Sequence, residues 1–152
     1  MVLSFKYKEV ANPEGIKKKR PMVPVTFSNG EVSFETLALL DSGADASAIS
    51  KEMAEVLGLD LTGKPEKSYG IGGAVDTITS RVNISVQKGH EHYIMTVDVR
   101  VILKDDIQLP PLLGRAGFFD EFEITFNDHK KKITLKKLDV VSRRFPKDNG
   151  QS

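Results

Sequence analysis

The sequence predicts an all-β domain, a barrel or a sandwich, with one or two short helices. Three observations support this fold class. The 152 residues suit one domain. Apolar and polar residues alternate along most of the chain, in long runs at 75–86 and 93–103 and in shorter runs at 2–10 and 22–27. Turn residues interrupt this alternation at short intervals, as in β-rich folds.

Three turn signals divide the alternating runs into hairpins. Asn29-Gly30 is a dipeptide typical of tight hairpins. Residues 88–91 join the two long runs, and Asn127-Asp128 joins 123–126 to 132–138. Between the first two turns, alternation from Val32 gives way to four consecutive apolar residues at 37–40. This change indicates a strand that passes from a half-exposed edge into the buried centre.

Two segments have the pattern of short helices. The first is 50–58, where Ser50 is a candidate N-cap and a glycine closes the segment. Met53, Val56 and Leu57 are expected on its buried face. The second segment runs from about 115 to 122.

The chain is expected to have three parts. Residues 1–30 form N-terminal strands and a basic loop, 31–140 form the main domain, and 141–152 form a frayed tail. The basic run 17–20 is interpreted as a solvated loop, with a phosphate-contacting patch as the alternative. The lysines around 130–137 are expected to face water from a surface strand and to guard a sheet edge.

Composition excludes several classes of site. The chain has no cysteine, which rules out disulfides, zinc–thiolate sites, iron–sulfur clusters and a cysteine nucleophile. With 22 basic and 21 acidic residues, it lacks the basic excess of a dedicated DNA-binding domain. It also lacks the apolar run of a membrane helix or a secretory signal. We therefore expect a cytoplasmic protein with neither nucleic acid nor membrane as a partner.

An acidic residue follows the most buried of the predicted strands. Asp41, Ser42 and Gly43 come directly after Leu39-Leu40. Burying a carboxylate is costly without partners, but here a hydroxyl can orient it and a glycine lets a ligand approach closely. The alternative interpretation is a plain turn in which the acid caps its own backbone.

Two further motifs lie downstream. Residues 69–73, Tyr-Gly-Ile-Gly-Gly, lack the ending of a phosphate-binding loop, which leaves a hairpin tip that serves as a lid or a simple turn. Residues 112–115, Leu-Leu-Gly-Arg, form a second apolar strand that runs into a glycine and a cation. Together with 39–44, these motifs resemble the retropepsin-like aspartic proteases, the single-domain relatives of retroviral and retrotransposon proteases. The resemblance covers about 32–138.

This resemblance implies a closed β-barrel of the single-domain aspartic protease type and a role for each matching residue. Asp41 is the catalytic residue, and Asp45 and Arg115 form a partly buried structural ion pair. The active-site loop comprises Ser42, Gly43 and Ala44; the flap comprises Tyr69, Gly70, Ile71, Gly72 and Gly73; the second motif comprises Leu112, Leu113 and Gly114. Where relatives often carry a second acid, this chain has Ala46, so its substrate pockets are expected to differ.

The implied activity is that of an aspartic endopeptidase. The mechanism uses two carboxylates that share a proton, whereas the chain contains one Asp-Ser-Gly. The expected active unit is therefore a homodimer that binds an extended protein or peptide substrate, without metal or cofactor. Ile71, Ile78 and Leu112 are candidate cleft residues that would favour apolar side chains around the cut. The alternatives are a non-catalytic peptide-binding or assembly module of the same fold, and a small nucleic-acid-binding barrel.

Overall fold

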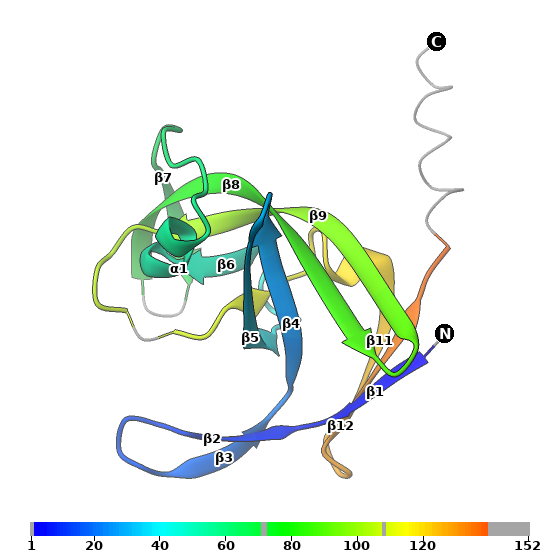
Figure 1. The fold of residues 1–152 in the computed structure, drawn as a ribbon. Coiled ribbons are helices and arrows are strands. Elements are labelled where there is room, and N and C mark those ends of the chain that lie inside the picture. Colours follow the sequence, from blue (N-terminus) through cyan, green and yellow to red (C-terminus); the bar gives the residue numbers. More distant parts are fainter. Residues whose placement is uncertain (1, 71–72, 108, 140–152) are drawn as a thin grey trace.

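The computed structural model describes residues 2–70, 73–107 and 109–139, and in these ranges the chain is built almost entirely of strands (Figure 1). The one α-helix in these ranges is α1 (Lys51–Val56), and a 3-10 turn, η1, covers Phe119–Glu121. The strands are β1 (Val2–Lys6), β2 (Lys8–Ala11), β3 (Lys17–Arg20), β4 (Met22–Asn29), β5 (Val32–Leu40), β6 (Ser47–Ser50), β7 (Glu66–Gly70), β8 (Gly73–Lys88), β9 (Glu91–Ile102), β10 (Leu112–Leu113), β11 (Phe122–Asn127) and β12 (Lys132–Lys137).

Six strands close into a ring. Their order is β4-β5-β10-β6-β9-β8, and β8 pairs back with β4 through a register that includes Val25 opposite Val86. Strand β7 extends the sheet beyond β8. The predicted all-β fold is confirmed, and its closure takes the form of this ring of hydrogen-bonded strands.

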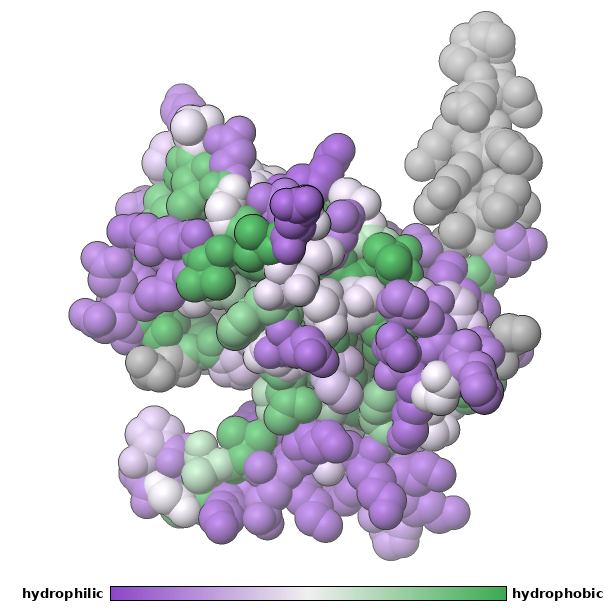
Figure 2. Space-filling model, viewed as in Figure 1, coloured by the Kyte–Doolittle hydropathy of each residue, from purple (hydrophilic) through white to green (hydrophobic). Residues whose placement is uncertain are grey.

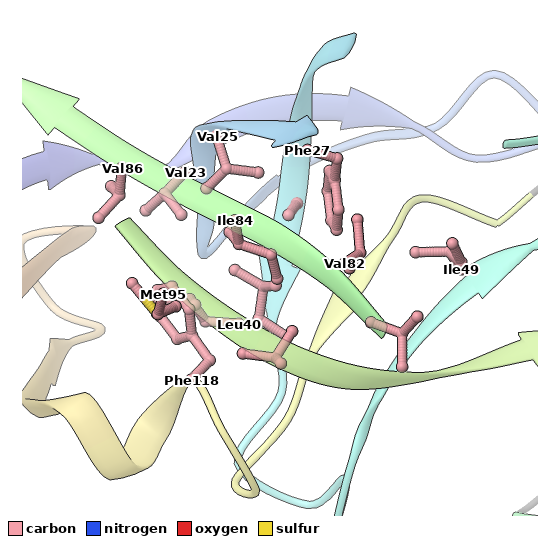
Figure 3. Packing of buried hydrophobic residues seen from close by; sticks show 14 of the residues in the cluster. Val23, Val25, Phe27, Leu40, Ile49, Val82, Ile84, Val86, Met95 and Phe118 are labelled. Atoms are coloured by element: carbon pink, nitrogen blue, oxygen red, sulfur yellow. The ribbon is translucent and has the colours of Figure 1, made fainter. Parts of the chain in front are cut away.

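The core lies inside the ring. Along β8, Val82, Ile84 and Val86 are buried, while the residues between them are half-exposed, because successive side chains of a strand point to opposite faces. Phe27 from β4 and Phe118 from the segment before η1 are fully buried. Figure 3 shows these side chains converging between β8, β9 and β4. The alternation seen in the sequence therefore identifies the inner face.

The predicted hairpin turns are confirmed. Asn29 pairs with Val32 across Gly30 and the residue after it, and Lys88 pairs with Glu91. The third hairpin joins β11 to β12 through a four-residue connection after Asn127. Strand β5 also has the expected change of environment, because its first half is exposed and its last residues are mostly buried.

A second sheet has the order β1-β12-β11. Its central strand is β12, where Leu135 pairs with Leu3 on one side and Ile124 on the other. Lys132 and Lys136 face water, as predicted. The expectation that this strand guards a sheet edge is wrong, because the N-terminal strand β1 covers the side that would otherwise be open.

The basic run of the N-terminal segment is a strand, not the predicted loop. Lys17–Arg20 pairs with β2 in a two-stranded arm, and all four residues are exposed. The turn lies earlier, where the Asn12 side chain accepts hydrogen bonds from the backbone N–H groups of Glu14 (3.0 Å) and Ile16 (2.9 Å). Gly15, at φ +85°, supplies the positive angle that this turn requires. The turn residues therefore close the arm before the basic run begins.

The predicted first helix is confirmed, with a shifted buried face. The Ser50 hydroxyl accepts from the N–H of Met53 at 3.2 Å, as an N-cap should. Met53 and Leu57 are buried, but Val56 is 61% exposed. Ala54 takes the buried place instead. A helix this short contacts the sheet along one stripe only, and that stripe passes through 53, 54 and 57.

The second predicted helix is shorter than expected. Only Phe119–Glu121 is helical, as a single 3-10 turn, and the residues before and after it are extended or turn. In the described ranges, no helix is both long enough and apolar enough to cross a membrane.

Candidate active site

Strand β10 brings together two motifs that lie far apart in the sequence. It lies between β5, to which it is parallel, and β6, to which it is antiparallel. Leu112 pairs with Leu39, and Leu113 pairs with Leu40. Each Leu-Leu pair is followed by a residue of a predicted motif, so Asp41 and Gly114 leave the same end of two adjacent strands.

The loop at Asp41 is held by its own backbone and by the neighbouring strand. The Asp41 N–H donates to the carbonyl oxygen of Leu113 at 3.0 Å, and the Asp41 carbonyl accepts from the Ala44 N–H at 3.1 Å. Asp41 is half-buried, and its Oδ1 accepts from the Gly43 N–H at 2.9 Å. The turn interpretation is thus correct for one carboxylate oxygen. The other oxygen has no hydrogen-bond partner in the part of the chain that is described.

Ser42 and Gly43 lie at the exposed tip of this loop. A Cβ atom at Gly43 would lie 3.3 Å from Asp41 Oδ1. A larger residue there would therefore press on the carboxylate rather than on the core.

Gly114 packs where no side chain fits. A Cβ atom there would lie 2.4 Å from the carbonyl oxygen of Ala46 and 2.9 Å from that of Ala44. The Gly114 N–H donates to the hydroxyl of Ser47 at 3.0 Å, and Ser47 is fully buried. Sequence reasoning missed Ser47. The signal was present, because Ser47 shares a strand face with Ile49, which is buried.

Asp45 and Arg115 form the expected ion pair, with 2.5 Å between Arg115 Nη2 and Asp45 Oδ1. The backbone reinforces this contact: the Arg115 N–H donates to the Ala44 carbonyl at 2.9 Å, and the Ala116 N–H donates to the Asp45 carbonyl at 2.8 Å. The prediction that the pair is partly buried is wrong for the single chain. The side chains are 82% exposed for Asp45 and 61% for Arg115, because both project outward from the joined loops.

The described residues of the glycine-rich segment lie at the ends of strands β7 and β8, which form a hairpin. Tyr69 pairs with Ala74 and Gly70 pairs with Gly73, while Ile71 and Gly72 lie outside the described residues. Tyr69 is 81% exposed. Within the described residues, no hydrogen bond or ion pair joins this hairpin to the loop at Asp41. The single chain brings the motif at Asp41 and the motif at Gly114 together. The glycine-rich motif lies apart from both, so its role as a flap stays a prediction.

Side-chain contacts hold the base of this hairpin. The hydroxyls of Ser68 and Thr77 lie 2.9 Å apart across the two strands, and Arg100 Nη1 donates to the Ser68 hydroxyl at 2.9 Å. Ile78, a candidate cleft residue, is buried at 6% exposure beneath Gly63. It therefore belongs to the interior. Leu112, the other described candidate, is half-buried and reaches the surface.

A family model described as aspartyl protease matches residues 23–116, more than half of the chain. The chain belongs to the aspartyl protease family. The match includes the loop at Asp41, the β7–β8 hairpin and the motif at Gly114, and the predicted resemblance to retropepsin-like proteases is confirmed.

One solved structure agrees with this fold. A retropepsin-like aspartic protease from Rickettsia conorii is similar with a TM-score of 0.50 and 20% identity, over 89% of this chain and 91% of that chain. EIAV protease in complex with the inhibitor HBY-793 is 28% identical, over 64% of this chain and 84% of that chain, with a TM-score of 0.41. No curated protein matches the chain.

Proposed function

We propose that the protein is an aspartic endopeptidase whose active unit is a homodimer, with Asp41 of each chain contributing to one catalytic pair. The observation that carries this proposal is the placement of Asp41. It follows a strand whose end is clamped by β10, with one carboxylate oxygen bound by Gly43 and the loop tip exposed. Such a loop can be presented to a second copy of itself across a two-fold axis.

The need for a second copy follows from the chemistry. Peptide hydrolysis of this class requires two carboxylates sharing one proton, and the chain contains a single Asp-Ser-Gly. Two carboxylates about 3 Å apart cannot both ionise cheaply, so one stays protonated. Their titration then belongs to the pair rather than to either residue.

In the proposed reaction, the ionised carboxylate takes a proton from water while the water oxygen bonds to the carbonyl carbon of the peptide. The protonated carboxylate gives its proton to the carbonyl oxygen. The proton taken from water then passes to the amide nitrogen, and one hydroxyl of the tetrahedral intermediate returns its proton to the other carboxylate as the C–N bond breaks. The products are a carboxylic acid and an amine, and the pair again holds one proton. Ser42 would brace the two loops, and Gly43 would contact the substrate backbone.

The remaining elements have supporting roles in this proposal. The β7–β8 hairpin, with Tyr69, Gly70 and Gly73, would cover a peptide bound as an extended strand. The Asp45–Arg115 pair would stabilise the dimer. We assign the protease unit to 31–140 together with β4, which closes the ring, with the rest of 1–30 as N-terminal strand and arm and 141–152 as a tail.

The test compares wild type with Asp41→Asn on a denatured protein mixture, from about pH 4 to pH 7. The matched control is Asp106→Asn, because Asp106 is exposed and its φ of 59° suits asparagine equally well. We expect cleavage by wild type and the control, and a loss on the order of 10³-fold or more for Asp41→Asn. Sedimentation should show a dimer for all three.

Three outcomes contradict the proposal. If Asp41→Asn still cleaves, Asp41 is not the catalyst. If wild type forms a dimer but cleaves nothing, the non-catalytic peptide-binding module is favoured. Cleavage by a species that sediments as a monomer would exclude the shared pair.

A further inference from the structure

A groove of about 340 Å³ lies between the β2–β3 arm and the strands that carry the catalytic motifs. Figure 1 shows the arm extending beneath the ring, and Figure 2 shows a notch between the arm and the body, with apolar surface where the two meet. Its apolar lining comes from both sides: Val10, Ile16, Met22, Leu39, Leu109 and Leu112.

The inner end of this groove adjoins the catalytic loop. Leu39 precedes Asp41 by two residues on β5, and Leu112, its partner on β10, precedes Gly114 by two residues. A strand rises about 3.3 Å per residue, so the groove begins about 7 Å from Asp41 along the strand. A side chain of an extended substrate reaches it from a position about two to four residues from the bond being cut.

The arm presents two different faces. In its register, Val10 lies opposite Lys18, and Ala11 lies opposite Lys17. Because side chains alternate along a strand, Lys18 and Arg20 share the face that lines the groove, whereas Lys17 and Lys19 point away.

The groove is cationic at its outer wall. Among the residues that the structure describes, Lys18 and Arg20 are the charged residues lining the groove, and no carboxylate lines it. Among the described residues, neither side chain takes part in an ion pair or a side-chain hydrogen bond. Two unpaired cations beside an apolar floor suit a side chain with an apolar stem and an anionic end.

We propose that this groove is a substrate subsite that selects a glutamate or aspartate side chain near the scissile bond, with Lys18 and Arg20 as the specificity-determining residues. The inference rests on the proposed function, since it supplies the substrate preference of that site. A partly exposed ion pair changes an equilibrium or rate constant by a factor of a few. Two such pairs would therefore favour an acidic side chain over its neutral amide by about tenfold in kcat/KM.

The experiment uses two charge-reversal variants of the same strand. K18E/R20E changes the groove face, and K17E/K19E makes the same change of net charge on the opposite face. Cut sites in a denatured protein mixture first identify preferred peptides. Pairs of synthetic peptides, with Glu in one and Gln in the other at a position two to four residues from the cut, then give the ratio of kcat/KM values. Circular dichroism checks that each variant is folded, and sedimentation checks that it is a dimer.

We expect wild type and K17E/K19E to prefer the Glu peptide about tenfold, whereas K18E/R20E loses or inverts this preference. Raising the salt concentration should shrink the wild-type ratio. Equal kcat/KM for the Glu and Gln peptides in wild type, or equal effects of both variants, would overturn the inference. So would a dimer weakened by K18E/R20E with an unchanged ratio, because the groove would then contact the second copy.

A binding measurement separates this inference from the proposed function. Fluorescently labelled Glu and Gln peptides are titrated into the Asp41→Asn variant. If no cut site has been found, the peptide sequences are taken from protein termini that are rich in Leu and Phe. Tighter binding of the Glu peptide, lost in Asp41→Asn/K18E/R20E, supports the subsite even where wild type cleaves nothing. Equal binding of the two peptides contradicts it.

Discussion

The loop at Asp41 and the β7–β8 hairpin are held in different ways. The loop is tied to β10 and to the motif at Gly114 by backbone hydrogen bonds, and Gly114 packs against the Ala46 carbonyl without room for a methyl group. The hairpin is an outer extension of the sheet. Within the described residues, its outer strand β7 pairs with β8 alone. Apart from the buried Thr77 at its base, the side chains that brace it are exposed or half-exposed, including those of the Lys67–Asp76 ion pair.

This difference matches what each region has to do in the proposed reaction. A catalytic carboxylate has to be held within about 0.5 Å of its productive position, which backbone contacts from several strands can achieve. A cover over a bound peptide has to open and close, which requires an element with few buried contacts. The following predictions test whether the two regions really differ in this way.

The largest difference in stability is expected when the same substitution, Gly to Ala, is made in each of the two regions. Gly114→Ala should lower the free energy of unfolding by about 3 kcal/mol, because the new methyl group overlaps backbone atoms that cannot move independently. Gly70→Ala meets nothing within 4 Å and should change stability by less than about 1 kcal/mol. Urea unfolding of both variants measures this, and similar losses would mean that the hairpin is as tightly held as the loop.

A smaller effect is expected from a buried hydroxyl. Ser47→Ala removes the acceptor of the Gly114 N–H, and an unsatisfied buried donor should cost about 1–3 kcal/mol. Ser42→Ala is the matched control, because Ser42 is exposed in the single chain. Its folding stability should be unchanged, while dimer affinity, measured by sedimentation, should fall if Ser42 braces the two loops. Equal stability of both variants would contradict the buried hydrogen bond.

The Asp45–Arg115 pair should contribute little to the fold of one chain. Both side chains are mainly exposed, so Asp45→Asn should lower the stability of the monomer by less than about 1 kcal/mol. If the pair acts at the dimer interface, the dimer dissociation constant should rise instead. Urea unfolding at low and high protein concentration distinguishes the two. A large loss at both concentrations would show that the pair supports the loop itself.

The smallest effect concerns the hairpin. A hydrogen bond to Asp76, and the charge of that carboxylate, raise the pKa of Lys67 above its usual 10.5. The resulting stabilisation is fully present below pH 10.5 and is lost as the pH rises through the higher folded-state value. In Asp76→Asn, the Lys67 pKa measured by NMR titration should return toward 10.5. An unchanged pKa would mean that this pair does not form in solution.

Local features of this protein were predictable from the sequence because they depend on neighbouring residues. Alternation identified the inward face of β8, Asn29-Gly30 marked a hairpin, and Ser50 marked the start of α1. The motif at Asp41 was recognisable for the same reason, since its residues are consecutive. The family to which the chain belongs followed from the order of such motifs.

Only the tertiary structure decided how distant segments meet. The pairing of Leu39 with Leu112 across more than 70 residues of sequence, the burial of Ser47 against Gly114 and the central place of β12 depend on contacts that no local pattern records. The exposure of the Asp45–Arg115 pair and the strand character of the basic arm were mispredicted for this reason. Residue type and spacing determine which face of an element is apolar, whereas the partner that covers that face is chosen by the packing of the whole chain.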